Sequence, residues 1–204
     1  MKTIITLFIA VILCSRVFSQ VSQQWYNTYN GTGNQNDFLA AMTVDNSGNV
    51  YAAGNSRGVS SNDDIAIVKY NSAGVVQWSQ RFNGSANNYD FAKSICVDNS
   101  GNVYVAGSTT GTGTNLDYTI VKYNSAGVEQ WVRWFISSGV DYLRKMIIDA
   151  SGNVYVTGLS NGDIKTIKFD ANGNMQWAQA YNGPGNDLDD GFDIAIDPSG
   201  NVIV

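Results

Sequence analysis

One phrase recurs four times along this chain and constrains its fold more than any other feature. Residues 45–51 read Asp-Asn-Ser-Gly-Asn-Val-Tyr, and close copies begin at Asp98, Asp149 and Asp197. Successive copies are 53, 51 and 48 residues apart. Such a period is typical of proteins that stack one supersecondary unit, each unit burying its faces only against its neighbours. The sequence therefore predicts a repeat architecture.

Each period contains four short segments rich in β-branched and aromatic residues, which in the first period are residues 39–44, 50–54, 65–70 and 75–82. Turn residues separate these segments, and helical periodicity is absent. In the first turn an aspartate can cap its own backbone and a glycine is free to take a positive φ. The glycines at this position are Gly48, Gly101, Gly152 and Gly200. Four antiparallel strands in 40–50 residues predict an all-β fold, the β-propeller of four-stranded blades.

A Gln-Trp pair marks the fourth, outer strand of each period. Its tryptophans are Trp25, Trp78, Trp131 and Trp177. We expect blades at residues 37–84, 90–136 and 141–183, preceded by an outer strand at 23–30 and followed by an incomplete blade at 189–204. The indoles could form a platform for stacking a ligand, but one indole at the same place in each repeat favours packing between blades.

The chain stops within a predicted strand, at Val204. A propeller needs at least about four blades, and an unfinished blade leaves apolar surface and strand edges open. We therefore expect a partial propeller that is a fragment of a longer protein. A defective four-bladed ring and a ring completed by two chains are the alternatives, and neither accounts for the missing third strand.

Residues 1–19 have the features of a secretory signal peptide. Lys2 precedes an apolar run from Ile4 to Cys14, and small side chains at Val17 and Ser19 suit cleavage before Gln20. The run is too short to span a bilayer comfortably, because spanning needs roughly 20 apolar residues. A lipoprotein anchor at Cys14 is disfavoured by the bulky residue before it. We expect residues 20–204 to be secreted or held at the cell surface, without membrane insertion.

Charge and cysteine content narrow the possible partners. Without Lys2 and Arg16, ten basic residues remain against seventeen acidic ones. This balance disfavours nucleic acid and anionic membranes, which both need basic patches. Cys96 is the one cysteine after the signal peptide, so no intrachain disulfide can form. Its apolar surroundings in the sequence predict a small buried side chain rather than a reactive thiol.

Aspartates also recur outside the turns, eight residues before the turn aspartate and at the start of the third strand. The first set is Asp37, Asp90, Asp141 and Asp189, and the second is Asp64, Asp117 and Asp163. Both sets should lie on one rim, where they could form an acidic binding surface or a calcium site. The alternative is that the carboxylates pin loops by accepting backbone N–H bonds. Calcium needs about six to eight oxygen ligands and no calcium-loop motif is present, so we favour pinning, with no cofactor and no metal.

The chain has no histidine. This removes the commonest general base, the Ser-His-Asp triad and the usual zinc ligand together. Paired carboxylates could still cleave a glycosidic bond, but each candidate aspartate belongs to a repeat position. We therefore predict no catalytic residues and no enzymatic activity.

The segment Asp98–Gly107, followed by Val121–Gly127, resembles the SBBP family of bacterial β-propeller repeats. The resemblance extends over essentially all of residues 20–204, although Pro198 and Ile203 depart from it in the last copy. It implies a secreted or surface-attached propeller that is one module of a long protein. The family has no shared catalytic residues, and no anchoring tail is present, so the resemblance leaves surface attachment open.

These observations predict a non-enzymatic extracellular scaffold that binds a protein or a glycan. A propeller enzyme is the alternative, either a quinoprotein-like dehydrogenase or a glycosidase or lyase. The Asn-Ser-Ala-Gly-Val-x-Gln-Trp phrase faintly resembles the docking motif of quinoprotein propellers, which use it structurally. A truncated fragment with no activity of its own is the third possibility.

Overall fold

The computed structural model describes residues 23–204, and the predicted signal peptide lies outside them. These residues form three four-stranded antiparallel sheets and one two-stranded hairpin, and they contain no helix. No segment among them could therefore cross a bilayer as an apolar helix. The predicted all-β architecture of four-stranded blades is confirmed.

Each sheet is built from consecutive strands in chain order, and we call the sheets blades 1, 2 and 3. Blade 1 consists of β1 (Asp37–Val44), β2 (Val50–Arg57), β3 (Asp63–Tyr70) and β4 (Val76–Phe82). Blade 2 consists of β5 (Asp90–Val97), β6 (Val103–Thr110), β7 (Leu116–Tyr123) and β8 (Glu129–Phe135). Blade 3 consists of β9 (Asp141–Ile148), β10 (Val154–Ser160), β11 (Asp163–Phe169) and β12 (Met175–Tyr181). The hairpin consists of β13 (Ala195–Ile196) and β14 (Val202–Ile203).

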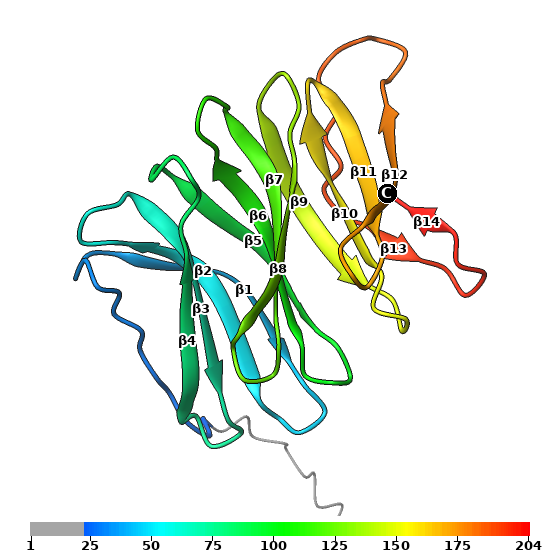
Figure 1. Ribbon diagram of the computed structural model, residues 1–204. Coiled ribbons are helices and arrows are strands. Elements are labelled where there is room, and N and C mark those ends of the chain that lie inside the picture. The colour runs from blue at the N-terminus through cyan, green and yellow to red at the C-terminus, as the bar shows by residue number, and fades with distance from the viewer. Residues whose placement is uncertain (1–22) are drawn as a thin grey trace, which may run out of the picture.

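The blades stand face to face in chain order, with the hairpin beyond blade 3 (Figure 1). We call the contact between blades 1 and 2 seam 1/2, and the contact between blades 2 and 3 seam 2/3. Seam 1/2 buries a cluster that includes Tyr51, Ile67 and Val105, and seam 2/3 buries one that includes Tyr104 and Leu143. The core therefore lies between sheets, so each blade depends on its neighbour for burial.

The recurring turn phrase folds in the same way each time. In the first copy, Asp45 Oδ1 accepts the backbone N–H groups of Ser47 and Asn49, both at 2.9 Å. Asp45 Oδ2 accepts the Asn49 side-chain amide at 2.8 Å and the Tyr51 hydroxyl at 3.0 Å. The turn glycines all have a positive φ between 78° and 84°, at Gly48, Gly101, Gly152 and Gly200. One carboxylate thus fixes both the turn and the tyrosine of the next strand.

Residues 23–30 belong to no sheet in the structure. They nevertheless contact blade 1 in the way that the outer strand of blade 1 contacts blade 2. The Trp25 indole donates to Ser72 O at 3.1 Å, and the Trp78 indole donates to Ser125 O at the same distance. Asn27 Nδ2 donates to Gly74 O at 3.0 Å, as Gln80 Nε2 donates to Gly127 O at 2.8 Å. The segment thus occupies an outer-strand position beside a blade face that the described residues leave open.

Candidate functional site

The predicted acidic rim lies where the loops between blades meet the loops between second and third strands. We call this edge the loop rim and the opposite edge, which carries the two turns of each blade, the turn rim. The loop rim comprises residues 31–36, 58–62, 83–89, 111–115, 136–140, 161–162 and 182–188. Strand order and direction place both sets of recurring aspartates on this rim.

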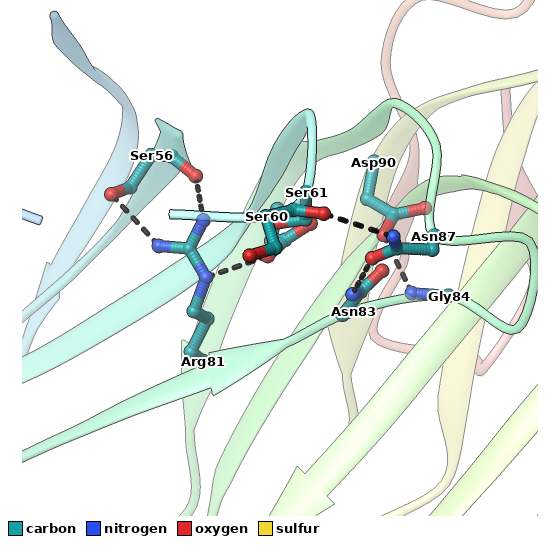
Figure 2. Close-up of polar contacts among 9 residues, drawn as sticks. Ser56, Ser60, Ser61, Arg81, Asn83, Gly84, Asn87 and Asp90 are labelled. Carbon is teal, nitrogen blue, oxygen red and sulfur yellow. Dashed lines mark hydrogen bonds and ion pairs between the residues drawn. The ribbon is translucent and has the colours of Figure 1, made fainter. Parts of the chain in front are cut away.

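The first set of aspartates holds the loops that lead into each blade. Asp37 accepts the Gly31 N–H at 3.0 Å, and Asp90 accepts the Gly84 N–H at 2.6 Å (Figure 2). The same contact recurs at 2.6 Å between Asp189 and Gly183. Asp141 accepts the backbone N–H of Ser137 at 3.1 Å and its hydroxyl at 2.8 Å. Charge-assisted bonds of this kind are stronger than neutral ones, so these carboxylates fix the course of the loops.

The second set differs from blade to blade. Asp64 accepts the Ser61 hydroxyl at 2.7 Å and pairs with the Arg81 guanidinium at 2.6 Å. Asp117 accepts the Thr114 hydroxyl at 2.6 Å, and Asp163 is only partly buried. Within the two sets, Asp64, Asp90, Asp117 and Asp141 are at most 2% exposed. The rim therefore does not present its recurring carboxylates as one open acidic surface.

The loops of the rim also bond to one another. Asn87, in the loop between blades 1 and 2, donates to Ser60 O at 3.1 Å (Figure 2). On the other side of this loop, Ser85 Oγ accepts the Thr112 N–H at 3.0 Å. The loop is thus tied to both neighbouring blades. Its conformation follows from these contacts, which connect loops about 27 residues apart in sequence.

The described residues contain no group of three or more Asp, Glu, Cys or His side chains that could hold a metal ion. Cys96 is partly buried, and its thiol lies 3.6 Å from Met146 O at seam 2/3. Burial raises the pKa of Cys96 to about 11. The thiol is therefore protonated at neutral pH and has little nucleophilic character.

Three of the recurring tryptophans, Trp25, Trp78 and Trp131, lie against the blade that follows them. Trp78 packs on Gly127 of blade 2, and Trp131 packs on Gly173 of blade 3. Trp177 contacts Tyr155 with a ring separation of 6.3 Å. The Trp131 indole N–H is buried without a partner, whereas those of Trp25 and Trp78 have one. The contacts of Trp25, Trp78 and Trp131 place these indoles between repeats, where they cover a glycine turn of the next blade, whereas Trp177 contacts a tyrosine of its own blade.

A row of lysine–tyrosine contacts at the turn rim was not predicted from the sequence. In each blade a third-strand lysine lies over the ring of the second-strand tyrosine. The pairs are Lys69 with Tyr51 at 5.2 Å, Lys122 with Tyr104 at 4.9 Å, and Lys168 with Tyr155 at 5.1 Å. The lysine and the tyrosine recur at the same positions of each period. Because cross-strand neighbours on one face of a sheet interact, this recurrence could have predicted the contacts.

An apolar hollow of about 320 Å³ lies on the open face of blade 1. Its lining includes Trp25, Leu39, Met42 and Val68. Leu39 aligns with Ala92 and Leu143, which are at most 1% exposed in blades 2 and 3, whereas Leu39 is 66% exposed. In blades 2 and 3 the equivalent face packs against the preceding blade. In blade 1 this face is open among the described residues and forms the hollow.

Asp90 makes seam 1/2 sensitive to pH. Burial raises its pKa to about 6, the N–H groups of Gly84 and Thr110 oppose the rise, and the charge of Asp64 adds to it. The unfolded value is near 3.8, so between about pH 4 and pH 6 the folded state binds the proton more tightly. The free energy of unfolding should therefore fall as pH rises through this window. Urea unfolding at several pH values gives the free energy of unfolding of the wild type and of Asp90→Asn. The difference between the two free energies measures the contribution of Asp90.

Asp45 provides a control of opposite sign. Burial raises the pKa of Asp45, but bonds from Asn49, Tyr51 and Ser47 outweigh it and hold the pKa below 3.8. Its contribution is present above the unfolded pKa and is lost as pH falls through the folded value. The difference between wild type and Asp45→Asn should therefore grow with rising pH in acid. An Asp90 difference that stays flat from pH 4 to pH 7 would contradict the expected effect.

Comparison with known proteins agrees with this geometry. A family model described as a beta-propeller repeat, SBBP, matches residues 77–113 and 130–165. Each match begins at the glutamine of a Gln-Trp pair and continues into the next blade. The chain therefore carries SBBP-type β-propeller repeats.

Two further similarities were found. An uncharacterised WD repeat-containing protein of Acanthamoeba polyphaga mimivirus is 29% identical over 164 residues, which are 69% of this chain and 11% of that protein. A crystal structure of the eukaryotic initiation factor superposes with a TM-score of 0.47 at 12% identity, covering 76% of this chain and 34% of that one. The chain thus spans only a small part of the length of the viral relative.

Proposed function

We propose that the protein is a non-enzymatic extracellular scaffold whose loop rim binds a protein or glycan partner. Extracellular placement is supported by residues 1–19, which have the sequence features of a secretory signal. A scaffold role is in keeping with the repeated fold, whose core between blades supports loops at both rims. Binding residues are often carried on loops that a rigid framework positions.

The observation that supports this proposal is that the loop rim carries loops of different sequence, and that buried carboxylates fix these loops through hydrogen bonds. The loops 58–62 and 111–115 have five residues each but differ in sequence, and the loop 161–162 has two, whereas the turns opposite them repeat. The buried carboxylates of Asp64 and Asp117 accept the hydroxyls of Ser61 and Thr114 in the first two of these loops. A loop ordered before binding loses less conformational entropy when a partner arrives, so the clamps favour affinity.

A paired-variant binding experiment tests this function. Immobilised glycans and extracellular matrix proteins would be probed with the wild type and two triple variants. Val59→Lys, Tyr89→Lys and Asn115→Lys change exposed residues of the loop rim. Asn46→Lys, Asn99→Lys and Ala126→Lys change exposed residues of the turn rim by the same charge.

The loop-rim variant should bind at least about 10-fold more weakly, because interface residues at the centre of a contact contribute over 1 kcal/mol each. The turn-rim variant should bind as the wild type does. Equal losses in both variants would place the site elsewhere. Turnover of a polysaccharide by the wild type would contradict the non-enzymatic part of the proposal.

A further inference from the structure

A polar hollow of about 360 Å³ opens at the loop rim of blade 1. Its lining consists of Gln35, Asn36, Phe38, Arg57 and Asp63. Four of these side chains carry hydrogen-bonding groups, and the fifth is an aromatic ring. The hollow therefore combines apolar and polar surface, as sites for small ligands do.

Strand pairing places three of the lining residues on one face of blade 1. Phe38 lies opposite Asn55 in the pairing of β1 with β2, and Arg57 lies two residues beyond Asn55. Asp63 lies opposite Arg57 in the pairing of β2 with β3. Because side chains two residues apart point to the same face of a strand, Phe38, Arg57 and Asp63 share a face. This face is the one toward blade 2, since the Asn55 side chain accepts the Ala92 N–H at 2.9 Å.

Backbone contacts hold the loops around the hollow. The Gly33 N–H donates to the carbonyl of Arg57 at 3.1 Å and ties residues 31–36 to the end of β2. The Gly58 N–H donates to the carbonyl of Asn62 at 3.3 Å and closes the loop between β2 and β3. A ligand that enters the hollow therefore meets loops that are already ordered, which lowers the entropic cost of binding.

The fold makes little use of the polar side chains in the hollow. Among residues 23–204, the side chains of Gln35, Asn36 and Asp63 form no hydrogen bond or ion pair. Arg57 forms one hydrogen bond, from Nη2 to Asn62 Oδ1 at 3.3 Å. Elsewhere on the loop rim, asparagine side chains bond to each other at 2.6–2.7 Å, in the pairs Asn30 with Asn34, Asn83 with Asn87 and Asn182 with Asn186. The hollow thus offers donors and acceptors that a ligand can use.

The charged pair of the hollow departs from the repeat. In blade 2 the places of Arg57 and Asp63 are taken by Thr110 and Leu116, which pair in the same way at the ends of the second and third strands. In blade 3 this end of the hairpin is the two-residue turn 161–162. Blades 2 and 3 form their strands without these charges, so the pair in blade 1 is not a requirement of the fold.

The chemistry of the hollow fits an uncharged sugar. The Phe38 side chain is 59% exposed, and an exposed aromatic face packs well against the C–H groups of a sugar ring. Sugar hydroxyls both donate and accept, so they can bond to guanidinium, amide and carboxylate groups at the same time. Arg57 and Asp63 carry opposite charges, so a ligand with a net charge of either sign would lie beside a like charge.

We infer that this hollow binds a neutral saccharide, with one sugar ring stacked on Phe38 and its hydroxyls bonded to Arg57 and Asp63. The amides of Gln35 and Asn36 supply further contacts. The inference rests on the proposed function, because it gives the glycan partner a chemical class and a place on the loop rim. It does not depend on which other loops of the rim contact a partner.

Isothermal titration calorimetry of the full chain with short oligosaccharides tests the inference. The panel contains linear neutral trisaccharides of glucose, mannose, galactose, xylose and N-acetylglucosamine. Trigalacturonic acid and the dipeptide glycylphenylalanine represent acidic and zwitterionic ligands. At least one neutral trisaccharide should bind with a dissociation constant below about 1 mM. Its affinity should change less than about twofold between about 0.05 and 0.5 M NaCl, because salt screens charges.

Two matched pairs of variants assign the binding to the hollow. Phe38→Ala should weaken it at least about 10-fold. Tyr181→Ala removes a ring that is also 59% exposed, from the outer strand β12, and should leave the affinity unchanged. Arg57→Gln should weaken binding at least about fivefold, whereas Lys93→Gln makes the same change of charge at an exposed position of β5 and should not. All four variants should melt within about 2–4 °C of the wild type, because the changed side chains are exposed or partly exposed.

Three results would overturn the inference. The first is the absence of binding by each neutral trisaccharide. If the loop-rim variant has nevertheless lost a matrix-protein partner, the proposed function stands without this site. The second is tighter binding of trigalacturonic acid or glycylphenylalanine than of any neutral trisaccharide, which would assign the hollow to a charged ligand. The third is equal weakening within either matched pair, which would place the sugar elsewhere on the protein.

Discussion

Replacing Gly107 with alanine should leave little or no folded protein. Gly107 lies in the second strand of blade 2, and a Cβ at this position would overlap the carbonyl oxygen of Phe91 in the adjacent strand. The obstacle is backbone, so no side-chain rotation relieves it. We expect a loss of at least about 4 kcal/mol, beyond the usual range for single substitutions. Urea unfolding monitored by tryptophan fluorescence measures the loss where folded protein is obtained.

The close approach arises from a bulge that every full blade contains. The first strand carries one extra residue in its pairing with the second, at Ala40, Lys93 and Arg144. A glycine lies beside the bulge each time, and a Cβ at Gly54 or Gly158 would also overlap a carbonyl oxygen of the first strand. Bulges bend and twist a strand, which brings its backbone unusually close to its partner.

Gly113→Ala is the control that separates backbone overlap from conformational strain. Gly113 has a φ of 82°, but a Cβ there would have nothing within 4 Å. Its replacement should cost only about 1–2 kcal/mol, the usual penalty for a side chain in the left-handed region. Equal stability of the Gly107 and Gly113 variants would contradict the expected overlap.

The strand pattern could be predicted from the sequence because its determinants are local. In the turn from Asp45 to Asn49, the aspartate bonds to backbone groups two and four residues away. The period of the repeat then fixes which strands belong to one blade, and the strands observed in blade 1 contain the predicted segments apart from Val75. Residues 23–30 differ from the predicted strand in lacking a ladder, because an outer strand needs a neighbouring third strand.

The arrangement at the seams could not be predicted, because it depends on residues of two different blades. Nothing near Asp90 in sequence indicates that the charge of Asp64, in the preceding blade, influences it. Asn55 and Ser108 are similar cases, since each accepts the backbone N–H of the next blade, from Ala92 and Leu143, at 2.9 Å. Such contacts follow from stacking rather than from the strand pattern.

Trp131 is central to seam 2/3. Its ring packs on Gly173 of the next blade and lies 6.1 Å from the ring of Tyr104. The Arg133 guanidinium lies 5.4 Å from the indole and also donates to Gly173 O at 2.6 Å. Trp131 adjoins the buried cluster of this seam, so its removal would open a cavity between blades 2 and 3.

We therefore expect Trp131→Ala to lower the free energy of unfolding by about 3–5 kcal/mol, as other large-to-small core substitutions do. Trp134→Ala is the matched control, since Trp134 lies on the same strand and is 50% exposed. It should cost less than about 1 kcal/mol, because partly exposed side chains away from the core contribute little. Denaturant unfolding of both variants gives the comparison. An unchanged stability of Trp131→Ala, together with weaker binding of a glycan or protein, would instead assign the indole to ligand stacking.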